Sequence, residues 1–374
     1  MRRDLELYIH IPFCVKKCAY CDFLSGPADA DTIEKYVQAL IREIEAVKIE
    51  TEKYRVVTVF VGGGTPSVLE GEQIERIFAA VKERFGLGEA DEITIEANPG
   101  TVTREKLRSY KRAGINRISF GLQSANNEEL KMLGRIHTYE EFLESYRLAR
   151  EEGFTNINVD LISAIPKQTL ESWKRTVDAI LELNPEHISA YSLIVEAGTP
   201  FEKLYGEGGS REAELPAEET ERVIYQKTKE WLRKAGYERY EISNYAKKGY
   251  ACRHNLGYWE RKEYLGLGLG ASSLIGNVRF QNTDEMQIYL QYDDNEEKRM
   301  LNREVLTREE ELEETIFLGL RKMEGISKKE VEKEYGKQIE KMICEGFLEE
   351  EKGKIRLTER GIDISNYVFA EILA

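Results

Sequence analysis

The feature that most constrains the fold is a regular alternation of short β-branched segments with longer amphipathic segments. The short segments predict strands at 5–11, 55–61, 92–96, 116–120, 156–161 and 187–193, and the longer ones predict helices at 32–47, 72–85, 104–113, 139–152 and 169–183. Such alternation is typical of a parallel sheet with right-handed crossover helices. Six units predict an α/β fold with an open, partial (β/α)6 barrel, since the pattern lacks the two further units of a complete barrel.

The pattern changes after about residue 195 and predicts a second domain near the end of the chain. A long helix is expected at 217–235 and a further strand at 237–243. From about 305 we expect three helices, a strand–turn–strand at 346–357 and a final helix. We therefore divide the chain into residues 1–295, the barrel with an extension, and 296–374, a mostly helical winged-helix-like domain. The apolar stretch 342–347 predicts that Cys344 lies in the core of that domain.

Charge and hydropathy limit the partners that the chain can have. The formal net charge is −14 over 374 residues, which argues against a nucleic-acid-binding protein. The apolar runs are too short to span a membrane, and no signal peptide is recognisable. We therefore expect a cytoplasmic protein with no transmembrane segment. Peripheral contact with a membrane and a homodimer stay open.

A cysteine motif follows the first predicted strand directly. Cys14, Cys18 and Cys21 lie within eight residues, and five cysteines in all do not make a disulfide framework. Three thiolates can hold three irons of a cubane cluster and leave the fourth iron open for another ligand. The alternative is a structural zinc site, for which His10 is the only close fourth ligand. We favour the cluster, as an iron–sulfur site with an open position.

Polar residues follow the other predicted strands at their carboxyl ends. In β/α barrels, chemistry is located at this end of the strands. Each residue has an alternative explanation, as a tight turn or a solvated cap, but together they predict one ligand-binding face. They are Gly62, Gly63, Gly64 and Thr65 after the second strand, Glu96 in the third, Gln123 in the fourth and Asp160 in the fifth.

The spacing of the cysteines, with Tyr20 before the last one, resembles the radical SAM superfamily. Further segments resemble the oxygen-independent coproporphyrinogen III oxidase family: 8–14, 62–67, 116–124, 133–137 and 158–161. The resemblance covers nearly the whole chain. It implies a [4Fe–4S] cluster on Cys14, Cys18 and Cys21. It also implies S-adenosylmethionine contacts by Tyr8, Tyr20, Gly63, Gly64, Thr65, Glu96, Gln123, Arg135 and Asp160, with Arg135 as a partner for the methionine carboxylate.

Two departures separate the chain from the oxidases of that family. Phe23 stands where those enzymes carry a further cysteine, and the chain begins too close to Cys14 for their N-terminal extension. One gained motif is also informative. His254-Asn-Leu-Gly-Tyr258-Trp259 resembles the His-Asn-x-x-Tyr-Trp motif of HemW-like heme chaperones.

This motif contains the groups that heme needs. Histidine is a usual axial ligand of heme iron, and the aromatic rings of Tyr258 and Trp259 can stack on the macrocycle. The exposed-looking turn 247–250 before the motif predicts access from solvent. Cys252 is an alternative ligand, and a buried structural histidine is the alternative explanation for His254.

The sequence thus favours a heme chaperone that binds heme, a [4Fe–4S] cluster and S-adenosylmethionine and delivers heme to respiratory heme proteins. One alternative is a coproporphyrinogen III oxidase of porphyrin biosynthesis. Another is a radical SAM enzyme with a different substrate. Whether the chain is an enzyme is left open, although the departures argue against the oxidase activity.

Overall fold

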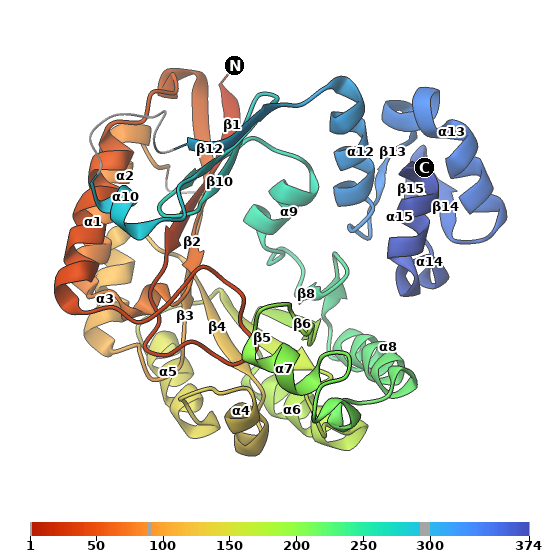
Figure 1. Cartoon of the computed structure of the whole chain (residues 1–374), viewed down its shortest axis with the longest axis horizontal. Helices are drawn as coiled ribbons and strands as arrows, with labels where there is room; N and C mark the ends of the chain where they lie inside the picture. The colour runs from red at the N-terminus through yellow and green to blue at the C-terminus, as the bar shows by residue number, and fades with distance from the viewer. Residues whose placement is uncertain (1, 89–90, 292–299, 374) are drawn as a thin grey trace.

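A computed structural model of the chain describes residues 2–88, 91–291 and 300–373. At its centre is a curved sheet whose six inner strands run parallel in chain order (Figure 1). They are β1 (Arg3–Ile11), β2 (Tyr54–Gly63), β3 (Glu92–Ala97), β4 (Arg117–Gln123), β5 (Ile157–Ser163) and β6 (His187–Ser192). The predicted partial (β/α)6 barrel is therefore confirmed.

Helices cover the convex side of the sheet (Figure 1). They are α1 (Ala30–Glu45), α2 (Gly71–Phe85), α3 (Arg104–Ala113), α4 (Asn127–Met132), α5 (Tyr139–Glu151) and α6 (Leu170–Leu183). Threonine side chains at 103, 138 and 169 accept a backbone N–H at the starts of α3, α5 and α6, which satisfies a donor that the helix leaves free. Local capping signals thus explain why these boundaries were predictable.

The alternation of side chains in β1 separates the two sides of the sheet. Leu5, Leu7 and Ile9 have no exposed surface and belong to the large hydrophobic core. Because successive side chains point to opposite faces, the polar residues between them, Glu6 and Tyr8, point to the concave side. The concave side of this sheet is therefore polar and is available for a site.

Further short strands extend both edges of the sheet. Next to β1 lies β9 (Tyr264–Leu267), which is parallel to it, followed by β10 (Ser272–Ile275), β11 (Val278–Asn282) and β12 (Met300–Val305). Beyond β6 lie β8 (Asn244–Ala246) and β7 (Glu238–Arg239). Of the single strand predicted at 237–243, only Glu238–Arg239 is a strand, and β8 begins directly after the predicted range. Strand β12 joins the main sheet. The predicted domain boundary at 295/296 lies outside the described residues.

Four helices accompany these edges: α7 (Pro200–Tyr205), α8 (Glu218–Lys234), α9 (Arg253–Trp259) and α10 (Met286–Leu290). Figure 1 shows α9 on the concave side of the sheet, between the barrel strands and the C-terminal helices. Single 3-10 turns occur at Thr51–Lys53, Pro66–Val68 and Glu212–Glu214. None of the described helices is both long enough and apolar enough to cross a membrane.

The C-terminal part has a hydrophobic core of its own. It contains α12 (Arg308–Gly319), β13 (Ile326–Ser327), α13 (Lys328–Cys344), the hairpin β14 (Leu348–Glu351) and β15 (Lys354–Leu357), α14 (Glu359–Asp363) and α15 (Ser365–Leu373). The prediction of three helices before the hairpin is wrong, because only two, α12 and α13, precede it within residues 300–373. The prediction for Cys344 is also wrong: Met342 faces the core, and Cys344, two residues further along the helix, is exposed.

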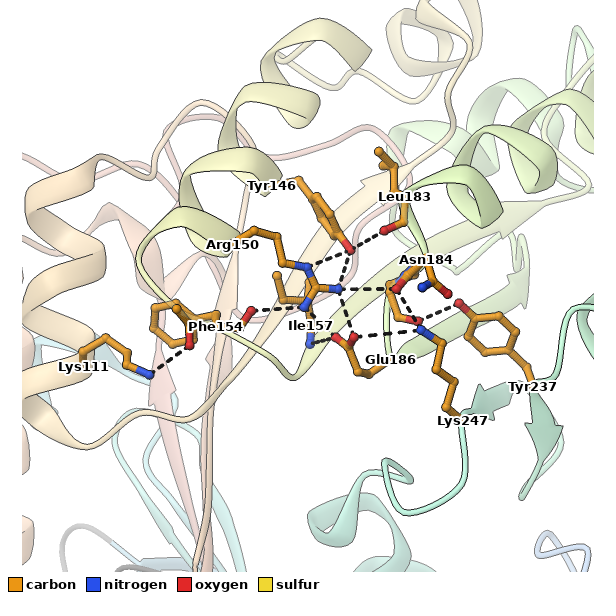
Figure 2. Close-up of polar contacts among 12 residues, drawn as sticks. Lys111, Tyr146, Arg150, Phe154, Ile157, Leu183, Asn184, Glu186, Tyr237 and Lys247 are labelled. Carbon is orange, nitrogen blue, oxygen red and sulfur yellow. Dashed lines mark hydrogen bonds and ion pairs between the residues drawn. The ribbon is translucent and has the colours of Figure 1, made fainter.

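A polar cluster fixes the amino ends of β5 and β6 (Figure 2). Glu186, just before β6, accepts hydrogen bonds from Arg150 of α5 at 2.8 Å and from the backbone N–H of Ile157 at 3.0 Å. Lys247 donates to the Asn184 carbonyl at 2.9 Å and lies 3.9 Å from the Glu186 carboxylate. Because the starts of both strands are held together, the polar residues at their carboxyl ends keep a fixed relative position.

Candidate functional site

The carboxyl ends of the six parallel strands surround an open pocket of about 410 Å³. This volume lies in the usual range for small-molecule sites. Every residue predicted for the cluster and for S-adenosylmethionine, except Tyr8, lines it: Cys14, Cys18, Tyr20, Cys21, Gly63, Gly64, Thr65, Glu96, Gln123, Arg135 and Asp160. The structure therefore brings together residues from five strand ends and from the α4–α5 connection.

The cysteine loop is held by backbone hydrogen bonds. The Cys14 N–H donates to the Gly26 carbonyl at 3.0 Å, and the Ala19 N–H donates to the Leu133 carbonyl at 3.1 Å. Gly64 packs so closely that an added Cβ would lie 3.0 Å from the Cys14 sulfur. Glycine at 64 therefore lets the turn after β2 approach the first cysteine.

The three cysteines fit a cluster better than a single ion. All three are free thiols that border the same cavity. Within the described ranges, no group of three or more His, Cys, Asp or Glu side chains is arranged to hold one metal ion. His10, the proposed fourth zinc ligand, donates from Nε2 to the Leu24 carbonyl and accepts from the Tyr8 hydroxyl, each at 3.0 Å. Thiolates spread around a cavity suit a cubane, which takes one cysteine per iron.

Two carboxyl groups form one wall of the pocket. The Glu96 carboxylate accepts the Gly63 N–H at 3.2 Å. Loss of hydration raises the pKa of Glu96 to about 8, and the nearby Asp160 charge adds to this effect. Asp160 accepts hydrogen bonds from Ser119 at 2.9 Å and from Asn158 at 2.7 Å. Such a wall favours a cationic ligand, and S-adenosylmethionine carries a sulfonium.

Gln123 reaches the pocket through an unusual backbone. Its φ is 74°, in the left-handed region that non-glycine residues rarely adopt, and the strand pairing shifts between Gly121 and Gln123. A Cβ on Gly121 would lie 3.0 Å from the Gln123 amide nitrogen. Tyr8 is different, because it does not line the pocket: its ring stacks on Phe60 with 6.5 Å between centroids, and its hydroxyl donates to His10.

Arg135 already has protein partners. Its Nη2 donates to the Asn98 side-chain oxygen and to the Gly121 carbonyl, both at 2.7 Å, and its Nη1 lies 3.4 Å from the Cys18 sulfur. The bidentate contact with a methionine carboxylate expected from the sequence requires some of these bonds to break. Asn98 was not predicted, although its position directly after β3 was a usable signal.

The His254 motif lies in the barrel interior, away from this pocket. His254 is only 1% exposed and stacks on Phe60, with 5.2 Å between centroids. Its Nδ1 is 2.7 Å from the Thr58 hydroxyl, and its Nε2 is 3.2 Å from the Tyr258 hydroxyl. Burial, with the charge of Arg117, lowers its pKa to about 3, so the imidazole is neutral. The expectation that His254 is reachable from solvent is therefore wrong, although Lys248 and Gly249 of the preceding turn are exposed.

Helix α9 is anchored at both of its ends. The Glu92 carboxylate accepts the backbone N–H groups of Arg253 and His254 at 3.1 and 3.2 Å. At the other end, the guanidinium of Arg321 lies over the Trp259 ring, 4.7 Å from its centroid. The motif thus connects the start of β3 to the C-terminal part of the chain.

Comparisons with known proteins agree with this geometry. The family model "Radical SAM superfamily" matches residues 8–180, and "HemN C-terminal domain" matches residues 306–364. A solved structure of Escherichia coli coproporphyrinogen III oxidase (HemN), described as a radical SAM enzyme, superposes with a TM-score of 0.83. It is 26% identical and covers 99% of this chain and 90% of that one. Fold and site thus define a radical SAM protein, and this class implies a [4Fe–4S] cluster and S-adenosylmethionine.

Proteins that are similar over most of the chain identify the family within this class. The protein named heme chaperone HemW from Lactococcus lactis is 38% identical over 381 residues, covering 100% of this chain and 98% of that protein. HemW of Bacillus subtilis is 36% identical, with 98% of each chain covered. HemW of Escherichia coli is 42% identical over 72% of this chain. The chain belongs to the HemW family of heme chaperones.

Proposed function

We propose that the chain binds heme and delivers it to respiratory heme proteins, and that it carries a [4Fe–4S] cluster on Cys14, Cys18 and Cys21. S-adenosylmethionine would lie beside the cluster, against Glu96 and Asp160. The reducing cytosol suits such a protein, because cluster ligands must be thiolates. The likeness to relatives named heme chaperones supports this function, and one surface feature carries the proposal.

That feature is a ring of exposed apolar side chains around the pocket. Phe23, Tyr191 and Ile194 line the pocket, and Val15 and Ile136 line a small recess beside it. We call these five residues the apolar rim. Phe23 is 62% exposed and Ile194 is 67% exposed. Clustered apolar side chains on a surface usually mark a binding site.

The charges beside the apolar rim suit heme. Lys16 and Lys17 also line the pocket, together with Asp22 and Glu196. The Lys17 ammonium donates to the Phe23 carbonyl at 2.8 Å, so Lys16 is the better partner for a heme carboxylate. Heme is a flat, apolar macrocycle with two carboxylate side chains, so a surface that offers apolar contact and cations together matches it. We therefore propose that heme contacts the chain at the apolar rim.

His254 remains a proposed ligand of the heme iron, but only if helix α9 moves. Both of its ring nitrogens have partners, and Cys252, the alternative ligand, is fully buried beside Glu92. Coordination by either residue requires α9 to leave the concave face. Lys247, which precedes the motif, already contacts Asn184 and Glu186, so it is a poor partner for a propionate.

Heme titration of the reconstituted chain, followed at the Soret band, tests the proposal. We expect one heme per chain. Ile194→Ser and Phe23→Ser should each weaken binding by about tenfold, because each removes a buried apolar contact of about 1–2 kcal/mol. Val305→Ser is the matched control, since Val305 is 58% exposed on the distant strand β12.

Two outcomes would change the proposal. Absence of stoichiometric heme binding by the parent chain would refute the chaperone function. If both rim variants bind heme as the parent chain does and His254→Ala does not bind it, heme binds at α9 and not at the apolar rim.

The oxidase alternative is tested in the same preparation. We expect no conversion of coproporphyrinogen III to protoporphyrinogen IX with reduced cluster and S-adenosylmethionine, because Phe23 stands where the oxidases have a cysteine. Multiple turnovers of this decarboxylation would make the chain an enzyme of porphyrin synthesis.

A further inference from the structure

A continuous chain of hydrogen bonds joins two of the three cysteine sulfurs. The Thr65 hydroxyl donates to the Cys14 sulfur at 3.4 Å and accepts from the Asn98 amide at 2.8 Å. The Asn98 side-chain oxygen accepts from Arg135 at 2.7 Å, and Arg135 donates to the Cys18 sulfur at 3.4 Å. We call these three residues the Thr65–Asn98–Arg135 bridge.

The direction of every bond in the bridge is fixed by chemistry. Arginine can only donate, so Asn98 must turn its oxygen toward Arg135 and its amide toward Thr65. Since the Thr65 oxygen accepts from Asn98, its one hydrogen is free to point at Cys14. Both ends of the bridge therefore direct donors at sulfur, and bonds in such a chain polarise one another.

Neighbouring groups hold the bridge in place. The Asn98 backbone N–H donates to the Ser67 hydroxyl at 3.1 Å, and its carbonyl accepts from Thr101 at 2.7 Å. Thr65 is 2% exposed, and Arg135 is also tied to the Gly121 carbonyl. Donors that are held this way need no reorganisation when the charge on the sulfurs changes.

We propose that the Thr65–Asn98–Arg135 bridge raises the reduction potential of the cluster. Reduction adds one electron, and part of the added charge falls on the sulfur ligands. Hydrogen bonds to those sulfurs stabilise the reduced form and so raise the potential. This inference goes beyond membership of the superfamily and rests on the proposed ligation by Cys14 and Cys18. It makes Arg135 and Thr65 positioning residues for the cluster, in addition to any contact with S-adenosylmethionine.

The test is a redox titration of the full chain with its cluster, without S-adenosylmethionine, monitored by electron paramagnetic resonance. Iron and sulfide are measured first. In Thr65→Val, which keeps the shape of the side chain and removes the donor, we expect full cluster content. We also expect the equilibrium constant for reduction of the cluster to fall at least tenfold, which lowers the reduction potential by about 59 mV for a one-electron couple. Asn98→Ala should shift the potential in the same direction by less.

Two variants serve as controls. Thr65→Ser keeps the hydroxyl and should match the parent chain. Ser192→Ala changes a side chain that lines the same pocket without contacting a bridge residue or a cysteine, and its potential should not move.

Each remaining outcome has a definite meaning. A parent-like potential in both Thr65→Val and Asn98→Ala, with full clusters, overturns the inference. Loss of iron in both variants, with iron retained in Thr65→Ser, would assign the bridge to cluster assembly and also overturns it. A parent chain without a cluster refutes the proposed cysteine ligation instead, and the iron analysis detects this before any titration.

Discussion

The barrel interior has two polar regions, and they use similar side chains in opposite ways. At the carboxyl ends of the strands, Glu96 faces an open cavity of about 410 Å³. Near the amino ends, Glu6 is 1% exposed and lies against Gly257 of α9, and neither carboxyl oxygen has a hydrogen-bond partner among the described residues. Loss of hydration raises the pKa of both carboxyl groups to about 8.

The contrast shows that free space, rather than residue type, separates a binding region from a structural one. A ligand can enter next to Glu96 and compensate its charge. Next to Glu6 the space is filled by α9, whose His254 lies 3.9 Å away with its nitrogens already paired. Five measurements can break or sharpen this comparison.

The largest effect is expected from the cysteines at the pocket. Replacing Cys14, Cys18 or Cys21 by Ala should remove nearly all iron and sulfide, since in the proposed ligation each thiolate would be the only protein ligand of one iron. Cys344→Ala, at an exposed position on α13, should retain the full content. Iron analysis after anaerobic reconstitution measures this, and an intact cluster in all three variants would exclude these ligands.

The next effect concerns the second ligand of the pocket. Gln123→Ala and Asp160→Ala should weaken S-adenosylmethionine binding by about 10- to 100-fold, the cost of about 1.5–3 kcal/mol for a hydrogen bond to a charged group. Equilibrium dialysis on cluster-loaded protein measures the affinity. His254→Ala should bind S-adenosylmethionine as the parent does. A comparable loss in that variant would mean that the two regions are coupled.

The same variant, His254→Ala, should lower the stability of the fold, because His254 lies in the buried region around α9. It removes a buried ring and leaves the Thr58 hydroxyl without its partner, so we expect a loss of about 3 kcal/mol in the free energy of unfolding. Urea unfolding followed by circular dichroism measures it, with the exposed-site variant Tyr367→Ala as a control near zero. Unchanged stability would show that α9 does not need its histidine.

Over the measured range from pH 6 to 8, the smallest effect is the pH dependence of stability from Glu6. The pKa of Glu6 is about 8 in the folded chain and about 4.5 when unfolded, so folding favours the protonated form. The contribution of the protonated carboxyl group to the free energy of unfolding is complete below pH 4.5 and is lost as the pH rises to 8, by up to about 1.4 kcal/mol per pH unit. In Glu6→Gln, the free energy of unfolding, measured by urea unfolding between pH 6 and 8, should depend less on pH than in the parent chain.

Glu96→Gln sharpens this last comparison. A cationic ligand favours the ionised carboxylate, so S-adenosylmethionine affinity should rise with pH up to about 8, and this variant should lose that part of the rise. Glu6→Gln should leave the pH profile of affinity unchanged. If it alters that profile, Glu6 acts on the pocket and the two regions are not separate.

Local sequence patterns determined much of the fold. The helix Arg104–Ala113 was predicted with its observed boundaries, and the six parallel strands were each predicted within three residues at either end, because capping and side-chain alternation are local properties. The short strands β9 to β12 were missed, since each has only four to six residues and their alternation is weak. The number of helices before the C-terminal hairpin was overestimated, since the structure has two there, α12 and α13.

The same division holds for the site. The sequence determined that cysteines, glycines and carboxylates meet at one edge, since parallel strands place their carboxyl ends together. Only the tertiary structure decided what surrounds each group: that Arg135 reaches Asn98 and a cysteine sulfur, and that His254 is enclosed by Thr58, Phe60 and Tyr258. Apart from Tyr258, which belongs to the same motif as His254, these neighbours lie far away in the chain, and no local pattern encodes the space left between them.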